Sequence, residues 1–488
     1  MRLINQAATA ALVLFTTHTL AQDATTCATV LTPAYSPPVV AEGWQAQLVA
    51  HNLRTPRGLK FDTKGALLVV DAQRGIIHLN LTDTGGVCVD VSRKTTLISL
   101  SDLNHGIEIS PDGTHLYASS REAVWRWDYD PSVPSVSNRR LIIQNMTNSD
   151  HATRTLYLSP SSPDLLLVSR GSAANIDPLS ALQENGIAQI RAFNISNLTS
   201  SSSVYNYPTD GLLVGWGLRN SVGIAEHPVT GGLYSVENNI DRTSRMGVDI
   251  HEENPGEELN FHGKLSDPDN DLIGGHYGYP HCFPLFNTTD FPEQGGLVVG
   301  NQFSLENEAD LNDEVCAREY IPPRLTFTAH MAPLDIKFSP EGTKAYVSFH
   351  GSWNRDNPAG YKVSVIKFKN VSGEPEEPRN STKGLAVDIF ANKDNNCRQN
   401  TCLRPAGLAV DARGRVFVSS DASGEVWVLE QTGDGGNGGG AGTEEGGEEE
   451  ESTNAAAAVV ARPGGEGWAV VGLTTLVAFF MGIEFVAL

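Results

Sequence analysis

Basic residues are scarce in this chain of 488 residues. It has 35 Lys and Arg against 57 Asp and Glu, which leaves a formal net charge of −22 at pH 7. A run of glutamates near the C-terminus supplies part of that excess, and no basic patch offsets it. A nucleic-acid-binding domain needs concentrated positive charge to neutralise phosphates, so the composition argues against a nucleic acid as partner.

Cysteine is also scarce. The six cysteines include no CxxC pair and no histidine neighbours at zinc-finger spacing, and their even number favours three disulfides. We expect Cys397 to close a small loop with Cys402 and Cys282 to reach Cys316, although six cysteines allow 15 connectivities. The complete set is Cys27, Cys88, Cys282, Cys316, Cys397 and Cys402.

The N-terminus has the pattern of a secretory signal peptide. A basic Arg2 is followed by an apolar stretch at residues 7–15 and by small residues before Gln22, so we expect residues 1–21 to be removed. A short buried helix is the alternative; the apolar stretch is too short to span a bilayer. Seven glycosylation sequons agree with export: Asn80, Asn145, Asn194, Asn197, Asn287, Asn370 and Asn380.

The C-terminal end has a different composition. Residues 432–453 are rich in Gly and Glu with almost nothing apolar, which predicts a disordered linker. Residues 454–488 then place small residues, a spacer and an apolar tail from Trp468 in the order of a GPI-anchor signal. A transmembrane anchor is the alternative, but no Lys or Arg follows the tail and Glu484 would lie in the hydrocarbon. We therefore expect an extracellular protein, anchored by GPI to the cell surface.

Residues 22–431 repeat one pattern six times. In each copy a short apolar strand leads through a turn with Pro, Asp or Gly to a second apolar strand, which predicts a β-hairpin. Repetition at this scale is typical of a six-bladed β-propeller, whereas a β-sandwich is the alternative all-β architecture. The copies are RGLKFDTKGALLVVD, GIEISPDGTHLYAS, TLYLSPSSPDLLLVS, GIAEHPVTGGLYSV, DIKFSPEGTKAYVS and GLAVDARGRVFVS.

Polar residues beside the hairpins are the candidate site. Loops from one side of each blade converge on the axis of a propeller, where a ligand pocket normally forms. Four arginines and three histidines in such positions, in an acidic protein, indicate an anionic ligand such as a multiply charged carboxylate, with a flat ring that Trp353 can stack on. These basic residues are Arg57, Arg219, Arg355, Arg404, His105, His151 and His330.

Several longer motifs carry a family resemblance. The runs DHATRTLYLSP, GWGLRNSVGIAEHP, HYGYP, AHMAPL, FHGSWNR with PAGYKV, and RPAGLAVD resemble the glucose/sorbosone dehydrogenase group of quinoproteins, in particular the fungal PQQ-dependent pyranose dehydrogenases. The similarity extends from about Arg57 to Val428. The resemblance implies a six-bladed propeller with PQQ and calcium on its axis, which oxidises the anomeric hydroxyl of a sugar to a lactone.

The resemblance also implies roles for particular residues. His151 would be the general base, Arg219 would polarise the quinone carbonyl, and Asn220 would bind the cofactor. Calcium would use main-chain carbonyls near a Gly-aromatic-Pro turn, which points to Gly278 and Tyr279. The other candidate cofactor-binding residues are Arg57, His105, His330, Trp353, Arg355 and Arg404.

Two departures from the family limit what the resemblance implies. The bacterial soluble glucose enzymes have His-x-x-Gly-Arg where this chain has His151-Ala152-Thr153-Arg154, so their sugar preference cannot be transferred. Some fungal relatives also carry a cytochrome domain and a cellulose-binding module, for which this chain shows no counterpart. The external electron acceptor, whether a copper oxygenase, a quinone or a cytochrome, is therefore open.

Two other functions fit a six-bladed propeller. A calcium-dependent lactonase or esterase also surrounds an axial calcium, and Glu237, Asn238, Asn239 and Asp241 are the residues that such a site would use here. They follow a single strand as one cluster, whereas ligands of such a site come from several blades. A non-catalytic cell-wall carbohydrate-binding propeller would need the hairpins but has no use for His151 together with Arg219 and Asn220.

Overall fold

The structure is a computed structural model. It describes residues 27–432 except 197, 199–202, 268, 396 and 398–401. The expected signal peptide, the linker beyond residue 432, the expected anchor signal and the sequon at Asn197 lie outside the described residues. Within the described part of the chain, no helix has the length and apolar character needed to cross a membrane.

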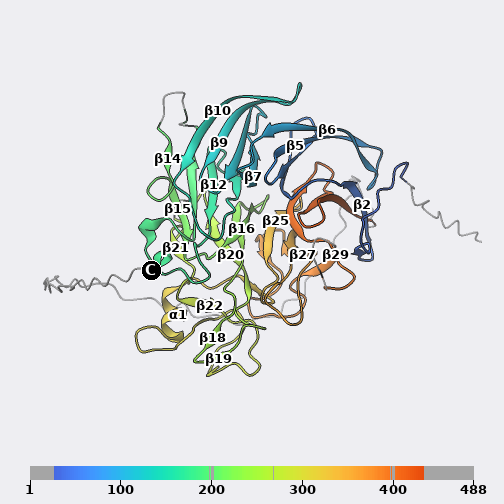
Figure 1. Cartoon of the computed structure of the whole chain (residues 1–488). Helices are drawn as coiled ribbons and strands as arrows, with labels where there is room; N and C mark the ends of the chain where they lie inside the picture. Colours follow the sequence, from blue (N-terminus) through green and yellow to red (C-terminus); the bar gives the residue numbers. More distant parts are fainter. Residues whose placement is uncertain are drawn as a thin grey trace, which may run out of the picture. The chain divides into compact units, whose positions relative to one another are not determined.

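Six sheets of four or more strands make up the fold, and each is one blade of a propeller. The first two blades contain β3 (Pro56–Phe61), β4 (Leu67–Asp71), β5 (Gly75–Asp83) and β6 (Val89–Ser99), then β7 (Leu103–Ile109), β8 (His115–Ser120), β9 (Val124–Asp130), β10 (Ser135–Gln144) and β14 (Tyr205–Asn206). The next two contain β11 (Leu156–Leu158), β12 (Leu165–Arg170), β13 (Gln189–Asn194), β15 (Leu212–Trp216) and β21 (Gly275–His276), then β16 (Ser221–Glu226), β17 (Gly232–Glu237), β20 (Glu257–Lys264) and β24 (Leu325–Phe327). The sheets fan around a centre near which β7, β16 and β25 lie (Figure 1).

The N-terminal strands complete the last two blades. The fifth blade contains β25 (Pro333–Phe338), β26 (Lys344–Phe349), β27 (Lys362–Lys369), β28 (Glu374–Pro375) and β29 (Val387–Ala391), and β1 (Val39–Val40) pairs with β29. The sixth contains β30 (Pro405–Val410), β31 (Val416–Ser420) and β32 (Glu425–Gln431), and β2 (Trp44–Ala50) pairs antiparallel with β32. The start of the propeller chain therefore closes the ring at its end.

The expected six hairpins are confirmed as the first two strands of the six blades. Five of their turns carry a glycine with φ between 72° and 82°, as a tight turn requires: Gly65, Gly113, Gly231, Gly342 and Gly414. The first strands of neighbouring blades also lie in close backbone contact. A Cβ on Gly58 of β3 would lie 2.1 Å from the carbonyl oxygen of His105 in β7. The six-bladed architecture is thus confirmed and the β-sandwich is not what forms.

The apolar core is divided among the contacts between blades. Leu59 of β3 packs with Phe417 of β31 between the first and sixth blades, and Val236 of β17 packs with Val347 of β26 between the fourth and fifth. These side chains are buried, and their burial removes each sheet face from water. Because the core lies between the sheets, the axis is left for polar groups.

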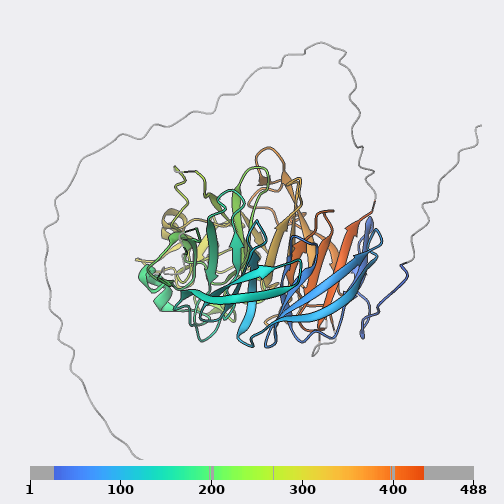
Figure 2. The ribbon, with the colours of Figure 1, turned by 90° about the horizontal axis from the view of Figure 1, so that it is seen from above.

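An insertion between β17 and β25 adds elements outside the blades. It carries β18 (Ser244–Arg245), β19 (Val248–Asp249), β22 (Cys282–Pro284), β23 (Gln302–Ser304) and α1 (Asp313–Glu319), which lie to one side of the sheets in Figure 1. Figure 2 shows the blades turned by 90°, with loops extending beyond the strand ends. Two short 3-10 helices, η1 (Pro178–Ala181) and η2 (Gln183–Asn185), follow β12.

The three disulfides join Cys27 to Cys88, Cys282 to Cys316 and Cys397 to Cys402. The two pairings expected from the sequence are confirmed, and the third links the N-terminal segment to the first blade. Cys282 lies in β22 and Cys316 in α1, so this bond holds the insertion together.

Candidate active site

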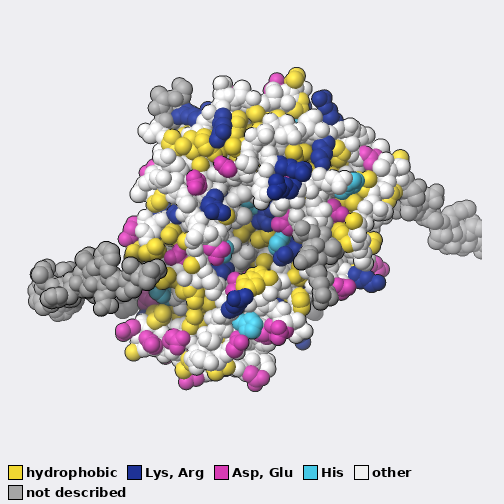
Figure 3. All heavy atoms as spheres, in the orientation of Figure 1, with side chains coloured by type: hydrophobic (Ala, Val, Ile, Leu, Met, Phe, Trp, Pro, Cys, Tyr) yellow, Lys and Arg dark blue, Asp and Glu magenta, His cyan; other side chains and the backbone are white. Residues whose placement is uncertain are grey.

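A cavity of about 580 Å³ lies where the blades converge. Its walls come from the segments that precede β11, β16 and β25 and from those that follow β17 and β26. Basic, acidic and histidine side chains lie side by side near the middle of the face shown in Figure 3. The lining residues that carry polar or aromatic groups are Asp150, His151, Asn175, Arg219, Asn220, Asn238, Asn239, Asp241, Arg242, Glu257, His330 and Trp353.

His151 is held in one tautomer by the loop after β12. Its Nδ1 lies 3.0 Å from the carbonyl oxygen of Ser172 and 3.0 Å from the Ser172 hydroxyl. A carbonyl oxygen can only accept, so Nδ1 carries the proton and Nε2 keeps a free lone pair. Burial, and next the positive charge of Arg219, lower the pKa of His151 to about 4. The imidazole is therefore neutral at pH 7 and is available as a base.

The segment that carries His151 is fixed by Arg154. This side chain is 0% exposed, and its guanidinium donates to the carbonyl oxygens of His151 at 2.7 Å and Met146 at 2.5 Å. Asn148 adds hydrogen bonds from its amide to the carbonyl oxygens of Gly171 and Ser172. Sequence reasoning treated Arg154 only as part of a motif and missed this positioning role. The buried charge, which has no carboxylate partner among the described residues, becomes visible only in the structure.

Arg219 is 3% exposed and is held by a ring of acceptors. Its Nε donates to the carbonyl oxygen of Asn175 at 3.0 Å, and its Nη2 lies 2.8 Å from Asn175 Oδ1 and 3.3 Å from Asp241 Oδ2. Its backbone N–H donates to Glu237. Asn220, the next residue, donates from its amide to Asn238 Oδ1 at 3.3 Å. Asn175 and Asp241 were not among the expected cofactor-binding residues because their loops carry no recognisable motif.

His330 lies opposite, with a left-handed backbone of φ 62°. Its Nδ1 is 3.4 Å from Asp241 Oδ1, and its Nε2 is 2.6 Å from the carbonyl oxygen of His251. Burial by itself would lower the pKa of His330, but the hydrogen bond to Asp241 and the negative charge of Glu257 raise it above its ordinary value. Asp241 and Glu257 thus favour the charged form of the His330 imidazole.

The floor of the cavity contains buried carboxyl groups. Glu257 lines the cavity and accepts hydrogen bonds from the backbone N–H groups of Ala332 at 3.0 Å and Asn239 at 2.7 Å. Burial raises the pKa of Glu257 to about 7. Behind it, Glu258 of β20 pairs directly with Glu237 of β17, and burial followed by the charge of Glu257 raises the pKa of Glu258 to about 8.

Trp353 provides a flat surface at the cavity. Its side chain is 63% exposed, and the Arg242 guanidinium lies 4.9 Å from the centre of its ring. An exposed indole beside a cation is suited to stacking a planar, negatively charged ligand.

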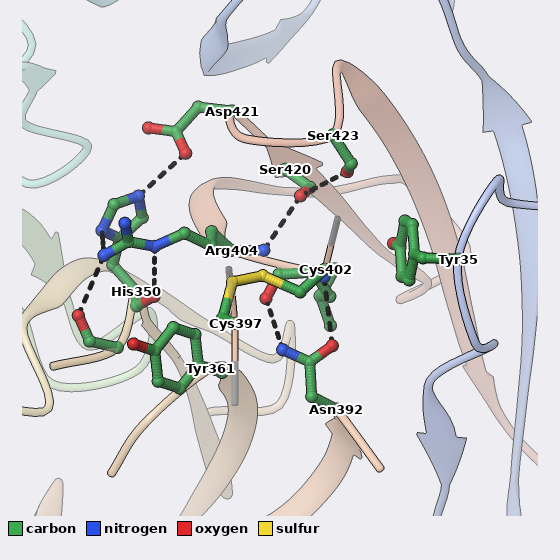
Figure 4. Close-up of a disulfide and its surroundings, with 12 residues drawn as sticks. Tyr35, His350, Tyr361, Asn392, Cys397, Cys402, Arg404, Ser420, Asp421 and Ser423 are labelled. Atoms are coloured by element: carbon green, nitrogen blue, oxygen red, sulfur yellow. Dashed lines mark hydrogen bonds and ion pairs between the residues drawn. A yellow bond between two sulfur atoms is a disulfide. The ribbon is translucent and has the colours of Figure 1, made fainter. Parts of the chain in front are cut away.

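The structure thus brings five of the nine expected catalytic and cofactor-binding residues to the cavity, namely His151, Arg219, Asn220, His330 and Trp353. Arg57 and Arg404 instead form a cluster with Asp421 and His350. Arg57 lies 2.6 Å from Asp421, His350 lies 2.8 Å from the same carboxylate, and Arg404 donates to His350 Nδ1 at 3.0 Å. Figure 4 shows Arg404 against His350 and Tyr361, near the Cys397–Cys402 disulfide.

His105 and Arg355 also lie outside the lining of this cavity. His105 is buried in β7, and its Nδ1 has no hydrogen-bond partner among the described residues. Arg355 binds the insertion, with hydrogen bonds to the carbonyl oxygen of Glu252 and, at 3.0 Å, to the carboxylate of Glu253.

Gly278 and Tyr279, whose main-chain carbonyls were expected to bind calcium, lie in the turn after β21. The carbonyl oxygen of Gly278 accepts from the backbone N–H groups of His281 at 2.9 Å and Cys282 at 3.0 Å, and the Tyr279 hydroxyl accepts from the N–H of Asp177. Neither residue lines the cavity. In the described part of the chain, no group of three or more His, Cys, Asp and Glu side chains is arranged to hold a metal ion.

These features define a class of protein: a six-bladed propeller whose axial cavity holds a neutral histidine beside a fixed arginine. Within that class, the chain belongs to the TrAA12-like family, whose model matches residues 38–432. The family expected from the sequence motifs is thereby confirmed.

Two curated relatives are named as dehydrogenases that depend on pyrroloquinoline quinone. The chain is 45% identical over 406 residues to the pyrroloquinoline quinone-dependent sugar dehydrogenase of Hypocrea jecorina, and the match covers 83% of this chain and 91% of that protein. It is 37% identical to the pyrroloquinoline quinone-dependent pyranose dehydrogenase of Coprinopsis cinerea, over 80% of this chain and 54% of that protein.

Two solved structures of similar proteins superpose on this chain. The calcium structure of a Trichoderma reesei carbohydrate-active enzyme of family AA12 superposes with a TM-score of 0.81 at 45% identity, over 83% of this chain and 100% of that one. The holo form of the PQQ domain of Coprinopsis cinerea pyranose dehydrogenase gives a TM-score of 0.77 at 34% identity, over 83% of this chain and 99% of that one.

Proposed function

We propose that the chain is a PQQ-dependent dehydrogenase that oxidises the anomeric hydroxyl of a sugar to a lactone and passes electrons to an external acceptor. The observation that carries the proposal is the pairing of a neutral His151, with its Nε2 free, and an immobilised Arg219 in one cavity. The names of the relatives in the family support the same reaction class.

The cavity fits PQQ, a flat tricarboxylate. It offers the guanidinium groups of Arg219 and Arg242 and the imidazole of His330 to carboxylate groups, and the exposed indole of Trp353 to a ring. A volume of about 580 Å³ is in the range of small-molecule sites. Arg219, Asn220, Arg242 and Trp353 are the residues that would hold it. When bound, PQQ supplies the quinone that accepts the hydride from the sugar.

The hydrogen bonds of this turn do not fit a calcium ion at the Gly278 carbonyl oxygen. The Gly278 carbonyl oxygen already accepts two backbone N–H groups, and the turn lies off the cavity. We therefore assign no step of the reaction to a metal held there.

His151 removes the proton in this mechanism. Its Nε2 takes the proton of the anomeric hydroxyl, while the Nδ1–H bond to the Ser172 carbonyl oxygen keeps the ring oriented and stabilises the imidazolium that forms. Arg219 cannot rotate away because Asn175 and Asp241 hold it, so its charge is preorganised for negative charge that develops in the cavity. The low pKa of His151 ensures that the proton is released again to solvent.

Dye reduction by the purified secreted protein tests this function. We expect reduction with a panel of aldoses and ketoaldoses only when PQQ is added, with calcium supplied as well. His151→Ala should keep the quinone absorbance of the bound cofactor and lose at least about 100-fold in sugar-dependent reduction, as expected for removal of a general base. No reduction by any sugar and no PQQ binding would favour the lactonase or the non-catalytic binding propeller.

We also propose that the protein works outside the cell. Three disulfides support an oxidising compartment. None of the six sequon asparagines in the described residues is buried, so each is accessible to glycosylation: Asn80, Asn145, Asn194, Asn287, Asn370 and Asn380. The signal peptide, the linker and the GPI anchor belong to the same proposal. Release of the protein from cells by a phosphatidylinositol-specific phospholipase would test the anchor.

A further inference from the structure

A second cavity, of about 430 Å³, lies on the same face of the propeller as His151. Pro56 at the start of β3 pairs with Asp71 at the end of β4, and Leu103 at the start of β7 pairs with Ser120 at the end of β8. The segments after β4 and β8 are therefore at the end of the blades where the first strands begin. The second cavity is lined by these segments, and His151 precedes the first strand β11 at the same end.

Two hydrogen bonds join this cavity to the segment that carries His151. The amide of Asn104, which lines the second cavity, donates to the carbonyl oxygen of Ala152 at 2.8 Å. The backbone N–H of Met146 donates to the carbonyl oxygen of Glu122, another lining residue, at 3.2 Å. Met146 and Ala152 are thus hydrogen-bonded to lining residues of the second cavity, while His151 of the same segment lines the first.

The lining of the second cavity suits a neutral ligand with many hydroxyl groups. Its charged side chains are one arginine, Arg121, and two acids, Asp102 and Glu122, and no large apolar side chain takes part. The side chains of Gln73, Arg121 and Glu122 make no hydrogen bond or ion pair with other described residues, so their donors and acceptors are available. A sugar ring presents both donors and acceptors, whereas an apolar or a highly charged ligand would leave one of these groups unmatched.

We propose that the second cavity is a carbohydrate subsite, which binds a glycosyl unit linked to the sugar that is oxidised beside His151. This inference rests on the dehydrogenase function proposed above and narrows its substrate class to short oligosaccharides with a free reducing end. The volume of about 430 Å³ lies in the range of small-molecule pockets.

The test compares a monosaccharide with disaccharides in the full-length protein loaded with PQQ. We measure dye-reduction kcat/KM for glucose, cellobiose, maltose, laminaribiose and gentiobiose. The wild type should prefer at least one disaccharide over glucose. Arg121→Ala/Glu122→Ala should reduce that preference about fivefold or more, because the variant lacks side-chain hydrogen bonds to the second glycosyl unit, and should change glucose oxidation less than about twofold.

Lys64→Ala is the matched control, because Lys64 is exposed in the turn after β3, at the opposite end of the blade. This variant should leave every kcat/KM unchanged. If no disaccharide is preferred, or if the double variant slows glucose and disaccharides equally, the subsite does not exist. If no sugar at all reduces the dye, the dehydrogenase function itself fails.

A binding measurement separates these outcomes. Methyl β-cellobioside and methyl β-glucoside cannot be oxidised at a blocked anomeric carbon, so saturation-transfer NMR reads their contacts without turnover. We expect saturation of both rings of the cellobioside in the wild type and loss of the signal from the non-reducing ring in the double variant. Equal saturation of that ring in both proteins would overturn the proposal.

Discussion

At the scale of single residues, His151 is the group whose chemistry depends most on its surroundings. Burial and the charge of Arg219 favour the neutral imidazole and bring the pKa to about 4. We therefore expect kcat/KM to be nearly constant from pH 7 down to about pH 5 and to fall about tenfold per pH unit below pH 4, as the base becomes protonated. A pH profile of dye reduction checks this. An acid limb with an apparent pKa near 6.5, the ordinary value of histidine, would show that the base is in another environment.

Arg154 gives a second prediction at this scale. Lysine keeps the charge but cannot donate to His151 and Met146 with a planar fork, so Arg154→Lys should let the segment move. We expect kcat to fall about tenfold or more while PQQ absorbance is retained, because small displacements of a catalytic group are costly. The acid limb of the pH profile should also move toward 6.5.

Arg191→Lys is the matched control. Arg191 is also buried in the same blade, at 7% exposed, but it bonds to Gln189 and to the carbonyl oxygen of Asp210, away from the cavity. It should leave kcat unchanged. A similar loss of kcat in Arg154→Lys and Arg191→Lys, with the acid limb of the pH profile unchanged, would indicate general destabilisation. In that case Arg154 would not act by positioning His151.

The sequence predicted which residues lie at the cavity for some of the candidates but not for others. Motifs singled out His151, Arg219 and Asn220, which line one cavity because each motif lies at a blade start. They could not separate these residues from Arg57 and Arg404, which start other blades but lie within a different set of hydrogen bonds, around Asp421 and His350. An arginine in a sequence does not reveal its counter-ion, and in this fold the partner is hundreds of residues away or on another blade.

At the scale of elements, the hairpins were predictable because they are local. The two strands of each hairpin are consecutive, and the turn glycines mark where the chain reverses. The pairing of the outer strands could not be predicted from the sequence. β21 pairs in parallel with β15 from about 60 residues further along the chain, and β14 pairs with β10 in the same way. Such pairings depend on the whole sheet, and short segments carry no signal for them.

The pair of strands β17 and β20 carries an electrostatic prediction. Glu237 and Glu258 lie directly opposite each other and are buried, and burial raises the pKa of both, that of Glu258 to about 8. The folded state then binds more protons than the unfolded state between about pH 4.3 and pH 8, so stability falls as pH rises through this window. Histidines with a lowered pKa act oppositely, but only below about pH 6.5.

The melting temperature should therefore decrease from pH 6.5 to pH 8, and Glu258→Gln should reduce that decrease. The amide oxygen of the variant can still accept from Asn239, so the hydrogen bond at this position is kept. Calorimetry across this range checks the prediction, with the exposed Glu319→Gln as control. If the melting temperature falls equally with pH in the Glu258→Gln and Glu319→Gln variants, Glu258 is ionised in the folded protein.

At the scale of the whole molecule, the ring is closed by residues that are distant in sequence. β2 pairs with β32, and the disulfide between Cys27 and Cys88 ties the segment before β2 to the first blade. The repeats predicted the number of blades but not this closure, because the closing strand resembles no hairpin copy. Six cysteines likewise allowed 15 connectivities, and only the closed ring brings Cys27 beside Cys88.

This closure has a measurable consequence. The Cys27–Cys88 bond spans 61 residues, and loop-entropy scaling assigns it about 4 kcal/mol, against about 2 kcal/mol for the Cys397–Cys402 bond, which spans 5. Cys27→Ser/Cys88→Ser should therefore lower the melting temperature more than Cys397→Ser/Cys402→Ser. Scanning calorimetry of both variants checks this. An equal loss would mean that folded-state contacts, and not restraint of the unfolded chain, decide how much each disulfide stabilises the propeller.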